Sequence, residues 1–78
     1  MSKLYKLLAK VLEVDEKEIN EDSSPENIST WDSFNGLILA TELEKEFSIN
    51  FTMEEIMDVA KVKDIKRLLK AHGVNPDD

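Results

Sequence analysis

The chain has 78 residues, of which 41% are hydrophobic and 35% charged, and its formal net charge is −7 at pH 7. We expect one small domain, residues 1–78, because a chain of this length buries only about 60% of its unfolded surface. Such a domain has little room for a deep catalytic cavity, which argues against a self-sufficient enzyme. The chain has no cysteine, so disulfides, thiol nucleophiles and zinc sites built on cysteine are excluded.

The apolar residues form neither a signal-peptide core nor a membrane span. Lys6 and Lys10 interrupt the apolar pattern near the start, and the longest apolar run, Leu37 to Ala40, has four residues. A membrane-spanning helix needs about 20 residues. We therefore expect a soluble, cytoplasmic protein that does not insert into membranes.

Acidic residues dominate the middle of the chain. Residues 21–58 hold ten Asp or Glu and a single basic residue, Lys45. An acidic surface repels nucleic-acid phosphates and anionic lipids and favours basic protein partners. The same charge also serves plain solubility, and the composition leaves both explanations open. We expect a monomer that binds other proteins and no nucleic acid.

The spacing of apolar residues predicts helices separated by one long connection. A helix is expected over residues 3–13, where one apolar stripe has helical spacing. Helical periodicity returns over residues 33–47 and again over 62–71. Thr52 and Glu55 have the spacing of a capping box, which predicts a short helix over residues 53–60. The stripe of the first helix consists of Leu4, Leu7, Leu8, Val11 and Leu12.

The segment between the first two helices is rich in polar and turn-forming residues and predicts a long ordered loop. Four apolar residues are available to hold it against the helices: Val14, Ile19, Ile28 and Trp31. No segment alternates long enough for a strand, and residues 72–78 are expected to fray. The predicted fold is therefore an all-α four-helix bundle with a long first connection and a short third helix.

The helix over residues 33–47 has two different faces. At about 100° per residue, its core face contains Gly36, Leu39, Ala40, Leu43 and Phe47, and Leu37 flanks this face. Phe34 and Ile38 fall on the opposite side, so we expect two large apolar side chains to face outward.

The sequence contains no recognisable catalytic or metal site. The single histidine, His72, lies in a basic last turn, and the chain has no glycine-rich phosphate loop or calcium loop. The feature that remains is Ser33, at the junction of the long loop and a helix. A phosphate on its hydroxyl would lie beside the unpaired amides and positive dipole of the helix start. Asp32 or Ser33 could equally serve only as an N-cap.

From Leu4 to Leu69 the chain resembles an acyl carrier protein. The features that carry the resemblance, in order along the chain, are Leu12-Glu13-Val14-Asp15, Ile19-Asn20-Glu21-Asp22-Ser23-Ser24, Asp32-Ser33-Phe34, Glu42-Leu43-Glu44-Lys45-Glu46-Phe47 and Ile49-x-Phe51. A bare Asp-Ser-hydrophobic tripeptide is a weak signal, whereas this ordered set is a strong one. Trp31 before the motif looks more like the free-standing carriers of specialised pathways than like the housekeeping fatty-acid carrier.

The resemblance implies a bundle of acyl-carrier type that carries a covalent 4'-phosphopantetheine on Ser33, with Asp32 as the neighbouring motif acid. The arm's thiol would hold intermediates of fatty-acid or polyketide biosynthesis as thioesters. The implied partners are a phosphopantetheinyl transferase and acyl-loading, acyl-transfer or condensing enzymes. The partner-binding positions that we predict are Phe34, Asn35, Ile38, Glu44, Glu46 and Met53. No catalytic residue is implied.

The chain departs from typical fatty-acid carriers along the helix after Ser33. Such carriers have acids two and five residues after the serine, where this chain has Asn35 and Ile38, and Lys45 replaces another usual acid. We therefore hypothesise that Phe34 and Ile38 form an apolar docking stripe in place of the charged one.

Two alternatives to an acyl carrier remain open from the residues. One is a carrier of amino acids or peptides, which shares the serine and the fold, and the other is an unmodified helical adaptor in which Ser33 is only a cap.

Gly36 could line a tunnel for an acyl chain or allow close packing against the loop. Trp31 could plug the loop onto the bundle or pack against the arm.

Overall fold

The computed structural model describes residues 3–76 and contains no strand within them. The elements in chain order are α1 (Lys3–Leu12), the 3₁₀ helix η1 (Glu16–Glu18), α2 (Ser33–Phe47), α3 (Met53–Met57) and α4 (Val62–Ala71). This is the all-helical bundle with a long first connection and a short third helix that the sequence predicts. Within the described residues, no helix is both long and apolar enough to cross a membrane.

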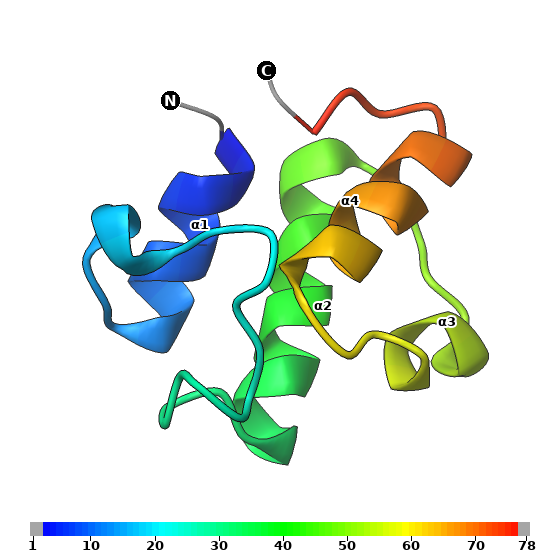
Figure 1. Ribbon diagram of the computed structural model, residues 1–78. Helices are drawn as coiled ribbons and strands as arrows, with labels where there is room; N and C mark the ends of the chain where they lie inside the picture. Colours follow the sequence, from blue (N-terminus) through cyan, green and yellow to red (C-terminus); the bar gives the residue numbers. More distant parts are fainter. Residues whose placement is uncertain (1–2, 77–78) are drawn as a thin grey trace.

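The core is built by α1, α2 and α4, with α2 in the middle of the molecule (Figure 1). The long loop runs across these helices and adds its own apolar side chains to the core. α3 contributes no fully buried residue, so it lies at the edge of the bundle. The buried hydrophobic residues of the cluster are Leu4, Leu8, Leu12, Ile19, Ile28, Trp31, Leu39, Leu43, Val62, Ile65 and Leu69.

Two helices end earlier than the sequence indicates. α1 ends at Leu12 because Glu13 adopts a left-handed conformation with φ 56°. α3 ends at Met57, not at residue 60, because the amide of Ala60 donates to the Asp64 carboxylate (3.0 Å) instead of to a helical carbonyl. The turn η1 was not predicted, although Asp15 and Glu18 form a capping box around it.

The long loop is ordered by hydrogen bonds from its own side chains. The Ser23 hydroxyl accepts from the Asn20 amide (2.9 Å), and Ser23 itself is buried. The loop in turn caps α4, whose N-cap residue has no side-chain cap: the amide of Val62 donates to the Ser23 carbonyl and that of Lys63 to the Glu21 carbonyl, both at 3.0 Å. The loop and α4 therefore hold each other in place.

The chain after α4 packs back onto the bundle, which corrects the expectation of a frayed tail over residues 72–78. Gly73, with φ 81°, turns the chain so that the Val74 amide donates to the Leu69 carbonyl at 2.8 Å. Val74 packs against the core and Pro76 is fully buried. The last part of the predicted tail, residues 77–78, lies outside the described residues.

The three long helices end in the same way, with one residue in the left-handed conformation. The residue is Gly73 after α4 but Glu13 after α1 and Ser48 after α2, with φ 54° at Ser48. Beyond Ser48, the Ile49 amide donates back to the Glu44 carbonyl (3.1 Å), as in a Schellman motif. Side chains with a Cβ are strained in this conformation, whereas glycine is not.

Ser48→Gly should therefore raise the free energy of unfolding, by up to about 1 kcal/mol, because the strain at the end of α2 disappears. Denaturant unfolding followed by circular dichroism measures the change. The matched control is Ser29→Gly, an exposed loop position without a positive φ, which should gain nothing. Equal effects of the two substitutions would show that Ser48 is not strained.

Candidate functional site

Ser33 is the first residue of α2, and it is exposed. The N-cap is Asp32: its Oδ1 accepts a hydrogen bond from the Asn35 amide (2.8 Å), and its carbonyl accepts one from the Gly36 amide (2.8 Å). Asp32 thus supplies the cap that the sequence left open between Asp32 and Ser33. The Ser33 hydroxyl is not needed for capping, which leaves it available at the positive end of a helix of 15 residues.

A line of hydrogen bonds fixes the turn before Ser33. The Asn35 side-chain amide donates to the Thr30 carbonyl (2.6 Å), and the Thr30 hydroxyl donates to the Leu12 carbonyl at the end of α1 (2.5 Å). The line therefore ties the start of α2 to the end of α1. Asn35, which the sequence placed among partner-binding residues, is half-buried and uses its side chain for this contact.

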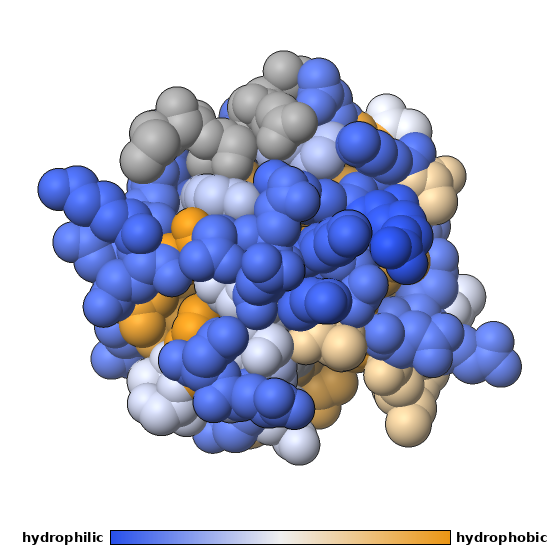
Figure 2. Space-filling model, viewed as in Figure 1, coloured by the Kyte–Doolittle hydropathy of each residue, from blue (hydrophilic) through white to orange (hydrophobic). Residues whose placement is uncertain are grey.

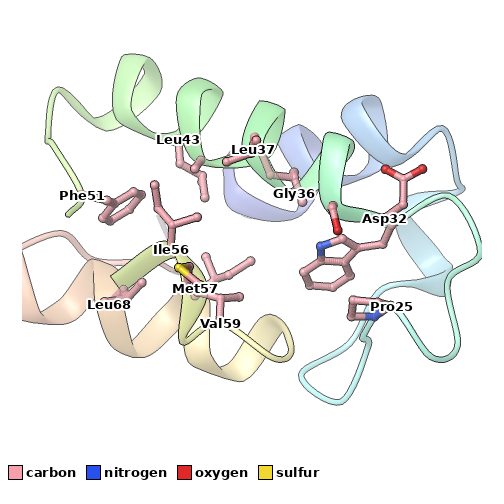
Figure 3. Close-up of a pocket in the computed structure, with 15 residues that line it drawn as sticks. Pro25, Asp32, Gly36, Leu37, Leu43, Phe51, Ile56, Met57, Val59 and Leu68 are labelled. Atoms are coloured by element: carbon pink, nitrogen blue, oxygen red, sulfur yellow. The ribbon is translucent and has the colours of Figure 1, made fainter. Parts of the chain in front are cut away.

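Beside Ser33 an apolar cavity of about 560 Å³ lies between α2, α3, α4 and the long loop (Figure 3). Among residues 3–76, the only charged residue that lines it is Asp32, which lies with Ser33 at the end nearest the start of α2. The volume is in the range of about 300 to 1,000 Å³ typical of small-molecule sites. The remaining lining residues are Pro25, Trp31, Gly36, Leu37, Leu39, Ala40, Leu43, Phe51, Ile56, Met57, Val59, Ile65 and Leu68.

The side chains of α2 are exposed in a different pattern from the one expected. Phe34 is 72% exposed, as predicted, but Ile38 is half-buried, and Leu37 is 51% exposed at the cavity. The helical wheel gives only the angle between residues. Which side is covered depends on α2 lying between α1 and the pair α3 and α4 (Figure 1). Ile38 is therefore less exposed than expected, whereas the docking stripe of Phe34 and Ile38 stays a prediction.

The other predicted partner-binding residues differ in their exposure and in whether their side chains form hydrogen bonds within the fold. Glu46 and Met53 are exposed, and Met53 is 62% accessible. Glu44 is half-buried, and its carboxylate accepts from the Phe51 amide at 2.7 Å, which holds the connection to α3. Sequence reasoning missed Met57, which is 76% exposed and also lines the cavity. Its spacing of four residues from Met53 was the signal available for it.

Trp31 plugs the loop onto the bundle and also forms part of the cavity wall. It is 6% exposed and belongs to the hydrophobic core. A Cβ added at Gly36 would meet nothing nearer than the Trp31 Nε1, at 3.8 Å, which is ordinary van der Waals contact. Close packing therefore does not require glycine at this position, and Gly36 is part of the lining.

Gly36→Ala should consequently fold and be more stable, by up to about 1 kcal/mol, because alanine is the better helix former and its methyl group fits. Thermal or chemical unfolding checks the sign. Ala40→Gly, one turn further on the same face of α2, is the matched control and should lose stability. A destabilised Gly36→Ala variant would mean that the packing around Trp31 is tighter than the structure shows.

Glu55 connects α3 to α4. One carboxylate oxygen accepts from the Thr52 amide (2.8 Å), and the other pairs with the His72 Nε2 at 3.1 Å. The His72 ring also stands edge-on to Phe51, with 5.4 Å between ring centroids. The hydrogen bond from the Thr52 backbone, with smaller contributions from His72, holds the pKa of Glu55 below its ordinary value of 4.5. His72 thus has a structural role, because it contacts both Glu55 on α3 and Phe51, which lines the cavity.

The pKa of Glu55 is lower in the folded protein than in the unfolded chain, so its negative charge stabilises the fold above about pH 4.5. This stabilisation is lost as the pH falls through the pKa that Glu55 has in the folded protein. The melting temperature of the wild type should exceed that of Glu55→Gln at neutral pH, and the difference should shrink in acid. Melting curves of both proteins at several pH values measure this. A difference that stays constant with pH would contradict the assignment.

Comparison with known proteins identifies a family whose sequence model matches most of this chain. Residues 2–69 match the family described as "Phosphopantetheine attachment site". Among solved structures, 43 chains match, one of which is a protein from Mycobacterium tuberculosis named as a candidate acyl carrier protein. The alignment has a TM-score of 0.79 and 22% identity and covers 88% of this chain and 92% of the other. No curated protein sequence matches the chain.

Proposed function

The chain belongs to the phosphopantetheine attachment site family, and we propose that it is an acyl carrier protein whose prosthetic group is attached to Ser33. The observation that carries the proposal is the exposed Ser33 at the start of α2 beside an apolar cavity. The family implies the 4'-phosphopantetheine, and the position of the serine supports its attachment there.

The residues around Ser33 fit the prosthetic group. Asp32 caps α2 in place of Ser33, so modification of the hydroxyl removes no hydrogen bond from the cap. The attached phosphate would lie next to the first amides of α2, where the helix dipole favours a negative charge. The arm supplies the thiol that binds the cargo, a group that the chain lacks because it has no cysteine.

The cavity favours an acyl cargo over an aminoacyl one. Beyond Asp32 and Ser33, the lining offers apolar side chains, among them Leu37, Leu43 and Ile56. An alkyl chain gains from leaving water for such a surface, whereas an ammonium group in the part of the cavity beyond Asp32 would lose its hydration without a charged partner. The arm would let a tethered acyl chain reach this cavity or a partner enzyme, and the reactive steps would belong to those enzymes.

The unmodified adaptor has less support than a carrier. It requires Ser33 to act only as a cap, and the cap is Asp32. A carrier must be modified by a phosphopantetheinyl transferase. In that reaction the Ser33 oxygen bonds to the phosphorus of the phosphopantetheine, the pyrophosphate bond of coenzyme A breaks, and adenosine 3',5'-bisphosphate leaves.

Intact mass after incubation with coenzyme A and a broad-specificity phosphopantetheinyl transferase should show one phosphopantetheine increment. The matched controls are Ser33→Ala, which should gain none, and Ser29→Ala, an exposed serine nearby that should behave as the wild type does. A folded wild type that gains no mass would contradict the carrier function. An increment that persists in Ser33→Ala would place the arm on another residue.

A further inference from the structure

The side chain of Trp31 carries a polar group that the fold does not use. Trp31 is 6% exposed and belongs to the hydrophobic core. Its backbone amide donates to the Ile28 carbonyl at 3.0 Å, but its indole N–H has no acceptor among residues 3–76. Buried indole N–H groups usually find a hydrogen-bond partner, and one without a partner calls for an explanation.

The indole nitrogen lies at the wall of the cavity. Trp31 and Gly36 both line the cavity, and the Trp31 Nε1 is 3.8 Å from the place that a Cβ on Gly36 would take. Because Gly36 has no side chain, nothing from this position of α2 covers the nitrogen. Figure 3 shows Asp32 and Gly36 toward one end of the cavity and Leu68 toward the other. The indole N–H therefore lies in the half of the cavity that is nearer to Ser33.

The cavity offers a cargo few other polar groups. In Figure 2, apolar surface gathers on the side of the molecule where the start of α2 and α3 lie, which is also where the cavity lies. Among its lining residues within 3–76, only Ser33 and Trp31 have a side-chain hydrogen-bond donor, since a carboxylate such as that of Asp32 only accepts. Attachment of the arm removes the hydroxyl proton of Ser33. Trp31 is then the remaining side-chain donor, and a single polar group in an apolar pocket orients the ligand.

The charge at this end of the cavity selects the kind of acceptor. The carboxylate of Asp32 would repel a carboxylate on the cargo, and no basic residue within 3–76 lines the cavity to offset it. A purely aliphatic chain would cover the indole N–H with methylene groups and leave it without an acceptor, which is unfavourable. The acceptor that fits is therefore an uncharged oxygen, such as that of a carbonyl group.

Resting on the proposed function, we propose that the indole N–H of Trp31 binds a carbonyl oxygen of the acyl group carried on the Ser33 arm. The acceptor belongs to the acyl group because the indole is buried at the cavity wall, whereas the arm begins at the exposed Ser33. The hydrogen bond holds the carbonyl at the end of the cavity near Ser33 and directs the alkyl chain toward α3 and α4. The cavity thus favours uncharged acyl groups with an oxygen near the sulfur.

The test compares three cargos of eight carbons on the arm of the ¹⁵N-labelled protein: an octanoyl thioester, a 3-oxooctanoyl thioester and an octyl thioether. The octyl group is the matched control, because it has the same chain length but no carbonyl. Trp31 is the only tryptophan, so its indole gives a single ¹H–¹⁵N signal. In at least one acyl form, the indole proton should move downfield and exchange with water about fivefold more slowly than in the octyl form, as expected for one hydrogen bond.

The two acyl forms identify the acceptor. A downfield shift in the octanoyl form assigns it to the thioester carbonyl, and a shift in the 3-oxooctanoyl form alone assigns it to the second carbonyl. Equal signals and exchange rates with octyl and with both acyl groups would overturn the proposal. A downfield shift that is already complete with the unloaded arm would overturn it too, because the acceptor would then belong to the arm. A wild type that gains no arm, as seen by intact mass, would instead contradict the carrier function.

Trp31→Phe keeps an aromatic ring in the wall and removes the N–H. In the wild type, the acyl form that shifts the indole signal should melt at a higher temperature than the octyl form. This difference should disappear in Trp31→Phe and persist in Ile56→Val, the matched control, which trims an apolar lining residue. A difference that Trp31→Phe retains would overturn the proposal. If Trp31→Phe does not fold, the comparison of cargos on the wild type decides.

Discussion

The position of Ser33 depends on hydrogen bonds that connect the first turn of α2 to the long loop and, through the loop, to α1. Asn35 and Thr30 connect the start of α2 to the Leu12 carbonyl at the end of α1, and Asp32 closes the first turn. These contacts hold the end of a long loop at one place on the bundle. Because other residues do the capping and the tethering, the serine hydroxyl can stay exposed and unused by the fold. A site for covalent attachment needs this combination of a fixed backbone and an available oxygen.

The cavity beside Ser33 exists because a small domain leaves one side of its core incompletely covered. α1, α2 and α4 bury the large side chains, whereas α3 buries none. α3 is held at its edges instead, where Glu55 pairs with His72 and the Glu44 carboxylate accepts from Phe51. The apolar residues that would otherwise complete the core remain available to a ligand in the cavity and to a protein partner at the surface. The same helix, α3, therefore contributes to the lining of the cavity and to the exposed apolar surface.

The features that could be predicted from the sequence are those set by local patterns of residues. The apolar stripes indicated the helices, and the change from polar loop to periodic helix at Asp32 and Ser33 marked the start of α2. Other features depend on contacts between distant residues. The end of α3 is set by the Asp64 carboxylate on α4, and the burial of Pro76 requires the tail to return to the bundle. The partial burial of Ile38 has the same origin, because helical angles do not tell which neighbours cover each side of a helix. Asn35 and Glu44 were assigned to partners, since a polar side chain gives no sign that a backbone group will engage it.

If Ser33 carries an arm loaded with an acyl group, the apolar cavity beside it should receive the acyl chain. The most direct test compares amide chemical shifts of the arm-bearing protein, labelled with ¹⁵N, with those of the same protein carrying an octanoyl group. The account predicts shifts at lining residues on two helices, Gly36 and Ala40 on α2 and Ile56 on α3. Changes confined to the residues next to Ser33 would show that the acyl chain stays outside and would contradict the account.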